Sequence, residues 1–230
     1  MASAKIQSGS SPAKRTKVIM NHQRSAFENP SPYAVWFFPD DNCNKVFCQL
    51  RFETEKKFDN YHEEFGGGQF IMSAELPREY PAKPPKHVKF LTPNGVFAVG
   101  GSICIDGGEF HPENYKKEQG FPEFLVGQIM NVMLNYKIVG SGISHIHGQT
   151  SKAQKQKFAK ESREWNKKNM RKYDKYDLYK EFEDAVPQWQ EQIKIQEAKL
   201  KEELQRAREE REKEKAKKEE VNNALDDLDF

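Results

Sequence analysis

The 230-residue sequence predicts an α+β protein, an α/β sandwich in which helices flank one four-stranded antiparallel sheet. Two observations lead to this prediction. Four short runs rich in aromatic and β-branched residues follow one another, with turn residues and no long helical segment between them. Segments with helical periodicity come before and after these runs. Strands connected in this way form a meander, and a chain of this length supports one domain of roughly 150 residues with extensions.

The first predicted elements precede residue 92. Residues 1–13 are small and polar, so we expect a disordered N-terminus. Residues 14–28 predict an amphipathic helix that ends at Asn29-Pro30. Its inward-facing residues are expected to be Val18, Ile19, Ala26 and Phe27. The predicted strands are residues 34–38, 46–52, 69–76 and 87–91.

Two helices are predicted after the strands. The first covers residues 122–134, with Pro122 in the first turn, where proline is tolerated. Its apolar face consists of Phe124, Leu125, Ile129, Val132 and Met133. The second covers residues 150–168. These elements complete a domain that we expect to span residues 14–172.

Residues 173–230 are expected to form a charged helical extension with an acidic tail. From Glu191 to Glu220, ten basic residues balance ten glutamates, and several pairs stand in the favourable i, i+4 order. A solvated helix is predicted, with a partner-dependent coiled coil or disorder as alternatives. Because the extension offers little apolar surface, removal of the chain after about Lys172 is expected to leave the core folded. The apolar tail residues fit either a docking peptide or a frayed end; they are Leu225, Leu228 and Phe230.

Charge and cysteine content exclude several functional classes. The formal net charge is +2, so neither nucleic acid nor a membrane surface is expected as the main partner. The longest apolar run, residues 34–38, is far shorter than the roughly 18 to 20 residues of a membrane span. Cys43, Cys48 and Cys104 suit no disulfide framework, and no signal peptide is recognised. We therefore expect reduced thiols and a location in the cytoplasm, with the nucleus as the alternative.

Cys104 is the residue that indicates chemistry. It lies between the small residues of segment 100–102 (GGS) and those of segment 106–108 (DGG). Bulky apolar residues usually surround a buried structural cysteine, whereas these neighbours leave space around the sulfur. Glycine also allows another backbone to approach closely. The sequence therefore predicts an accessible thiol.

Four motifs in order resemble those of the ubiquitin-conjugating enzymes. They are YPAKPP at residues 80–85, TPNG at residues 92–95, SICID around Cys104, and the His-Pro pair at His111. The resemblance covers about residues 14–170 and is greatest to the J-type branch, in which a TPNG-like sequence replaces His-Pro-Asn. It implies the fold predicted above and an acyltransferase whose Cys104 carries ubiquitin as a thioester before transfer to an amine or a hydroxyl group. It implies no cofactor or metal, and its partners are ubiquitin, the ubiquitin-activating enzyme, a ubiquitin ligase and a protein substrate.

The resemblance also suggests roles for residues near Cys104. Asn94 takes the place of the motif asparagine, which either stabilises an oxyanion or braces the loop; read alone, Pro-Asn-Gly is also an ordinary turn sequence. His111 either faces the cleft or braces a loop, and bracing is preferred. No Asp or Glu lies between residues 124 and 160, so the gate carboxylate of many family members is missing. The auxiliary candidates near that position are Ser141, His145 and His147, and either histidine can act as a base or be an ordinary surface residue.

Ligase binding and location depart from the family pattern. Pro81 and Pro122 match the two loops that bind ligases, but Ala82 stands where many members have an aromatic anchor. The membrane anchor of the J-type relatives is not found, so their location in the endoplasmic reticulum is not carried over.

Other readings of the sequence remain open. The same fold occurs as an inactive scaffold, and related enzymes carry other ubiquitin-like modifiers. A cysteine hydrolase would pair Cys104 with His111. A zinc site would need an uncommon ligand spacing among Cys43, Cys48, His145 and His147. The order of the four motifs favours the conjugating enzyme.

Overall fold

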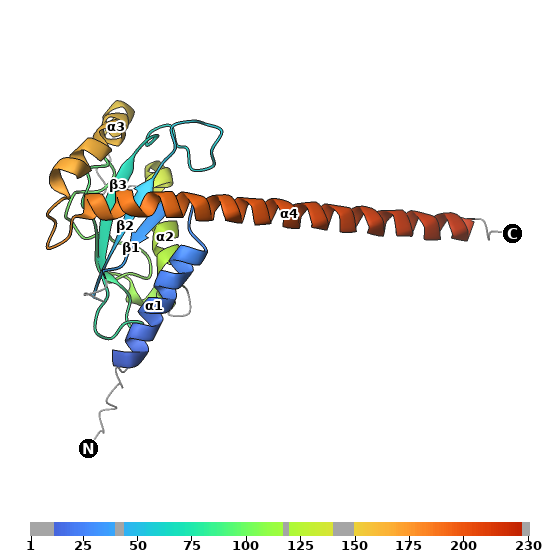
Figure 1. Ribbon diagram of the computed structural model, residues 1–230, viewed down its shortest axis with the longest axis horizontal. Helices are drawn as coiled ribbons and strands as arrows, with labels where there is room; N and C mark the ends of the chain where they lie inside the picture. Colours follow the sequence, from blue (N-terminus) through green and yellow to red (C-terminus); the bar gives the residue numbers. More distant parts are fainter. Residues whose placement is uncertain (1–11, 40–43, 117–119, 140–149, 227–230) are drawn as a thin grey trace, which may run out of the picture.

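The computed structural model describes residues 12–39, 44–116, 120–139 and 150–226. Figure 1 shows the elements in chain order. They are α1 (Pro12–Glu28), β1 (Ala34–Phe37), β2 (Lys45–Arg51), β3 (Gln69–Glu75), β4 (Lys86–Phe90), the 3-10 helix η1 (Pro112–Asn114), α2 (Phe121–Val139), α3 (Lys152–Asn169) and α4 (Leu178–Asp226). The α+β class is confirmed.

The four strands form one antiparallel sheet in the order β1-β2-β3-β4. Across it, Trp36 pairs with Cys48, Cys48 with Met72, and Met72 with Phe90. Each strand begins and ends within one residue of its predicted limits. The turn-rich segments between the runs therefore located the strands correctly, and the predicted meander is confirmed.

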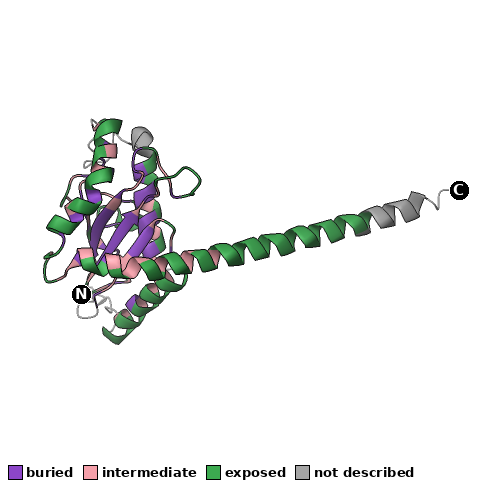
Figure 2. Ribbon diagram, turned by 45° about the horizontal axis from the view of Figure 1, so that its top comes forward, coloured by how far each residue is buried: buried purple, intermediate pink, exposed green. Residues whose placement is uncertain are grey.

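Helices cover both faces of this sheet. Five consecutive residues of β2 are buried, and since side chains alternate across a strand, both faces must be covered. On one face, Cys48 and Met72 pack with Ile19 of α1 and with the apolar residues of α2. On the other face, Phe47 and Ile71 pack with the beginning of α4. Figure 2 shows the resulting buried centre.

The predicted apolar faces of the helices are largely confirmed. In α2, Pro122 lies in the first turn, and the residues buried as predicted are Leu125, Ile129, Val132 and Met133. In α1, Ile19 is buried as predicted, but Phe27 is 44% exposed. Phe27 follows the last turn that reaches the core, so its ring lies at the surface beside α4.

α4 consists of a buried beginning and an exposed continuation. Leu178 and Phe182 are fully buried in a cluster with Met170 and several tyrosines. At the edge of the domain, Trp189 Nε1 donates to the carbonyl of Ser31 at 3.0 Å. From there the helix leaves the domain (Figures 1 and 2), which agrees with the predicted helical extension. The described parts of the chain contain no helix with the length and apolar character needed to cross a membrane.

The buried beginning of α4 changes the expected effect of truncation. A cut after Lys172 removes Leu178 and Phe182 from the core, so we predict a loss of about 3 to 6 kcal/mol in the free energy of unfolding, from the burial of two large apolar side chains. A chain ending at Lys199 keeps both residues and the Trp189 contact. It should match the full chain within about 0.5 kcal/mol in urea unfolding. Equal stability of the two truncated chains would show that the start of α4 contributes nothing.

Candidate active site

Cys104 lies in an extended segment beside β4. The backbone N–H of Ile103 donates to the carbonyl of Val88 at 2.7 Å, which ties this segment to the sheet. Ile103 and Ile105 are buried, whereas Cys104 between them is half-buried. Because neighbouring side chains of an extended chain point in opposite directions, the two isoleucines turn the thiol outward.

The glycines before and after Cys104 differ in their surroundings. A Cβ atom added at Gly100 would meet nothing within 4 Å. Gly107 and Gly108 are buried, and a Cβ atom at Gly108 would lie 2.6 Å from Cγ1 of Ile105. Gly107 has φ of +72°, which glycine adopts without strain. The glycines after Cys104 thus build a tight turn, whereas the open space lies at Gly100, four residues before the cysteine.

Asp106 and Asn114 hold the segment that follows Cys104. Asn114 Nδ2 donates to Asp106 Oδ1 at 2.6 Å, which joins the two ends of this loop. Burial and, secondarily, the negative charge of Asp106 raise the pKa of the Cys104 thiol. The exposed His111 ring lies 3.3 Å from the carboxylate of Glu113, two residues further on. Its side-chain contact is local, so the side chain that braces this loop is Asn114.

Asn94 is fully buried and shapes the TPNG loop. Its Oδ1 accepts hydrogen bonds from the backbone N–H groups of Val96 at 2.8 Å and Phe97 at 2.9 Å. Its Nδ2 donates to the carbonyl of Thr92 at 3.2 Å. This is the side-chain-to-backbone pattern of an asparagine turn. The geometry supports the bracing alternative over direct contact with a reacting group.

Thr92 attaches the TPNG loop to β3 and α3. Its hydroxyl accepts from the N–H of Ile71 at 3.0 Å and donates to Asn166 Oδ1 at 2.6 Å. Asn166 Nδ2 in turn donates to the carbonyl of Gln69 at 2.8 Å. Thr92, which stands where the wider family has histidine, is therefore a fully buried structural residue.

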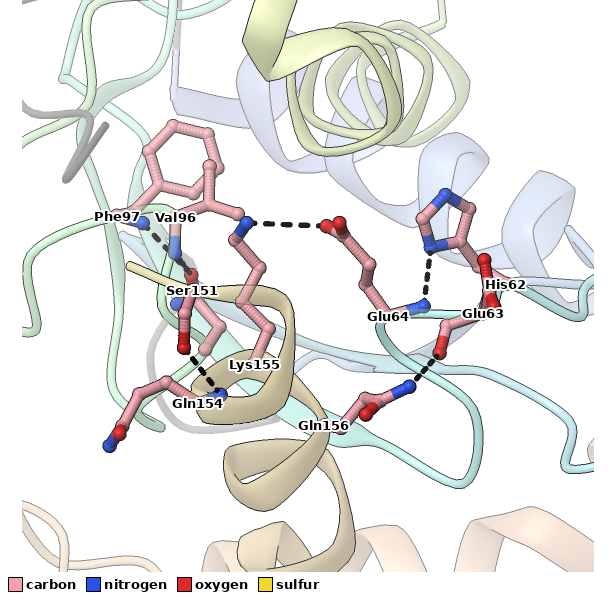
Figure 3. Close-up of polar contacts among 10 residues, drawn as sticks. His62, Glu63, Glu64, Val96, Phe97, Ser151, Gln154, Lys155 and Gln156 are labelled. Atoms are coloured by element: carbon pink, nitrogen blue, oxygen red, sulfur yellow. Dashed lines mark hydrogen bonds and ion pairs between the residues drawn. The ribbon is translucent and has the colours of Figure 1, made fainter. Parts of the chain in front are cut away.

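Lys155 of α3 packs against the same loop. Gly95 has φ of +79°, and a Cβ atom there would lie 2.9 Å from Cγ of Lys155. The Lys155 ammonium, itself fully buried, forms an ion pair at 3.2 Å with Glu64. Figure 3 shows the lysine extending from α3 past Val96 toward this carboxylate. Gln156 binds the adjacent carbonyl of Glu63 at 3.1 Å, so α3 joins the TPNG loop to the loop before β3.

The other predicted site residues lie apart from this arrangement or outside the described residues. Ser141, His145 and His147 are outside the described residues, as is Cys43. Pro81 is half-buried and Ala82 is exposed in the wall of a pocket of about 640 Å³. The ring of Pro122 is buried, so a partner can reach Ala82 but not this proline. Within the described residues, no three His, Cys, Asp or Glu side chains are placed to hold a metal ion.

Sequence reasoning missed the residues that support the site. Lys155, Ser162 and Asn166 of α3 are buried polar residues in a helix that reads as mostly charged. Their spacing along one helix face was a usable signal, but exposed lysines and asparagines are far more common, so the pattern alone did not identify them. Glu64 lies in a loop and Asn114 ends the short 3-10 helix η1, and neither gave a signal.

The comparisons with known proteins come from relatives and solved structures, since no family model matches the chain. The chain is 35% identical over 102 residues to "Probable ubiquitin-conjugating enzyme E2 33" of Arabidopsis thaliana, covering 44% of this chain and 39% of that protein. It is 31% identical over 105 residues to "Ubiquitin-conjugating enzyme E2 6" of Debaryomyces hansenii, covering 46% and 40%. It therefore spans about two fifths of the length of these relatives.

A solved structure, that of human ubiquitin-conjugating enzyme E2 G1, is 18% identical, with a TM-score of 0.40, and the match covers 52% of this chain and 93% of that one. Fourteen curated proteins match in all, and those described above carry the name that the four motifs had indicated. Over the matched part of its length, the chain is therefore similar in sequence to ubiquitin-conjugating enzymes.

Proposed function

We propose that this chain is an active ubiquitin-conjugating enzyme in which Cys104 carries ubiquitin as a thioester. The observation that carries the proposal is the half-exposed thiol of Cys104, fixed between two buried isoleucines. A thioester acceptor needs one reachable sulfur and room for an extended peptide end. Cys48 lacks this access because it is buried in β2.

The reaction consists of two acyl transfers through the same sulfur. The Cys104 thiolate attacks the carbonyl carbon of the ubiquitin thioester held by the activating enzyme, a new C–S bond forms, and the activating enzyme's thiolate leaves. A substrate amine then attacks the Cys104 thioester, the C–S bond breaks, and the amine loses a proton. A hydroxyl acceptor would react in the same way. A ligase would bring the substrate to this thioester.

The pKa of Cys104 has consequences for both steps. Because burial and Asp106 raise it, the thiolate is a minor species at neutral pH, and loading should quicken as the pH rises toward the pKa. A thiol of high pKa is a stronger nucleophile once ionised and a poorer leaving group afterward. The loaded thioester is therefore expected to be comparatively slow to transfer without an activating partner.

The first test is a charging assay with the activating enzyme, ATP and ubiquitin. We expect a band one ubiquitin heavier that thiols remove, and Cys104→Ser should replace it with a thiol-resistant ester or no band. Cys48→Ala, which changes a cysteine buried away from solvent, is the matched control and should still load. If the wild type fails to load, exchanging the activating enzyme and the modifier identifies an enzyme for another ubiquitin-like protein. Failure with every modifier would leave the inactive scaffold as the answer.

Asn94→Ala tests whether the TPNG loop is braced from within. The substitution leaves the buried N–H groups of Val96 and Phe97 without an acceptor, which costs about 2 to 4 kcal/mol in the free energy of unfolding. We expect loading and transfer to fall together with this loss of stability. Urea unfolding and single-turnover transfer from loaded enzyme measure the two effects. Selective loss of transfer with unchanged unfolding would instead assign Asn94 to oxyanion stabilisation.

Asp106→Asn tests the electrostatic control of the thiol. Removing this negative charge lowers the pKa of Cys104, so the thiolate fraction at pH 7 rises. We expect iodoacetamide to alkylate Cys104 about two- to fivefold faster, with the pH midpoint of the rate displaced to lower pH. The asparagine can still accept the hydrogen bond from Asn114, so the loop is preserved. Glu113→Gln, which removes an exposed carboxylate paired with His111, should leave the rate unchanged; an equal effect of both substitutions would contradict the assignment.

A further inference from the structure

An apolar groove lies where α4 leaves the domain, away from Cys104. It has a volume of about 540 Å³ and is bordered by α1, β1 and α4. Aromatic side chains from all three elements line it, among them Phe27, Trp36 and Trp189. Met20 and Phe27 on its α1 side are 60% and 44% exposed. Large apolar side chains left open to water in one concave place indicate a binding surface.

Charge narrows the choice of ligand. Of the described side chains that line the groove, Arg24 is the one that carries a formal charge. α1 as a whole has four basic residues and a single acidic residue, Glu28. A complementary ligand therefore combines apolar side chains with negative charge.

The chain itself contains a segment of this composition. Residues 225–230 read LDDLDF, which contains three apolar residues and three aspartates. The segment follows a long stretch in which basic and acidic residues balance, so its net negative charge is distinct from the rest of α4. Leucine and phenylalanine side chains suit the aromatic lining, and the aspartates suit Arg24.

The segment cannot reach the groove of its own chain. α4 is helical from Trp189, which lines the groove, to Asp226. At about 1.5 Å per residue, this separates the two by about 55 Å. Residues 227–230, even fully extended, span at most about 14 Å. Figure 1 shows that α4 points away from the domain over this whole length.

We propose that the groove binds the acidic segment, residues 225–230, of a second copy of this chain. In a dimer with antiparallel α4 helices, each acidic segment lies beside the groove of the other copy. Both contacts form together because the distance along α4 from groove to acidic segment is the same in the two copies. The contact is then made twice around one two-fold axis, which closes the assembly as a dimer. The exposed charged faces of α4 run beside each other between the two contacts. This inference does not depend on the chemistry of Cys104.

Sedimentation velocity of the full chain over a range of concentrations tests the proposal. We expect a reversible dimer that weakens as salt is raised, because part of the contact is ionic. Arg24→Glu should raise the dissociation constant about tenfold, and so should the paired change Leu228→Ser with Phe230→Ser. Restoring the dimer by combining Arg24→Glu with Asp227→Lys and Asp229→Lys would link the two surfaces directly.

Leu204→Ser tests the α4 pairing separately, since Leu204 is 52% exposed on α4 outside the groove. A dimer lost in this variant but kept in Arg24→Glu would mean helix pairing through α4 and would overturn the proposal. Binding of a peptide of residues 222–230 to the full chain provides a second measurement. The peptide carries a quencher, and binding is followed as the loss of tryptophan fluorescence from the chain, since Trp36 and Trp189 line the groove. Equal binding of a scrambled peptide, or a chain that stays monomeric and does not bind the peptide, would also overturn it.

Discussion

The polar seam between α3 and the sheet is the interaction on which the rest of the site depends. It consists of Lys155, Ser162 and Asn166, three buried polar residues on one face of α3. Ser162 accepts from the N–H of Gln69 at 2.9 Å, and Asn166 donates to the carbonyl of the same residue. A buried polar group that loses its partner costs about 1 to 3 kcal/mol. The seam therefore permits one register of α3 against β3, where an apolar face would tolerate several.

The position of Cys104 follows from this register through a short chain of contacts. The seam holds Thr92 and packs Lys155 on Gly95, so the TPNG loop has one conformation. Asn94 then directs the chain toward Phe97, whose ring stacks on Phe90 of β4 with centroids 5.2 Å apart. Beyond Phe97 the chain runs along β4 to the thiol. The buried pair of Lys155 with Glu64 adds little net stability to this path, because taking both charges out of water offsets much of their attraction.

The elements and the reactive residue could be predicted from the sequence, and the seam could not. The strands follow from aromatic and β-branched content between turn residues, and α2 follows from helical periodicity and the position of Pro122, all of which are local signals. Cys104 stood out because small residues surround it, although Ile103 and Ile105, which orient it, passed unnoticed. The beginning of α4 was misjudged for a related reason. Charged residues dominate its composition. Leu178 and Phe182, which anchor it in the core, are buried by tertiary contacts, and no pattern in the neighbouring sequence indicates this burial.

Tertiary contacts also determine the direction in which α4 leaves the domain. Its first turns fill the second face of the sheet, and Trp189 and Gln196 bond to carbonyl groups at the end of α1 and just after it. The helix therefore leaves the domain in a fixed direction. Beyond this point it has exposed i, i+4 pairs such as Glu214 with Lys218 at 2.7 Å, which favour helix without providing a surface to bury. A helix anchored at one end and self-supporting at the other acts as a spacer of defined length. The far end of the described helix consequently lies away from its own domain (Figure 1).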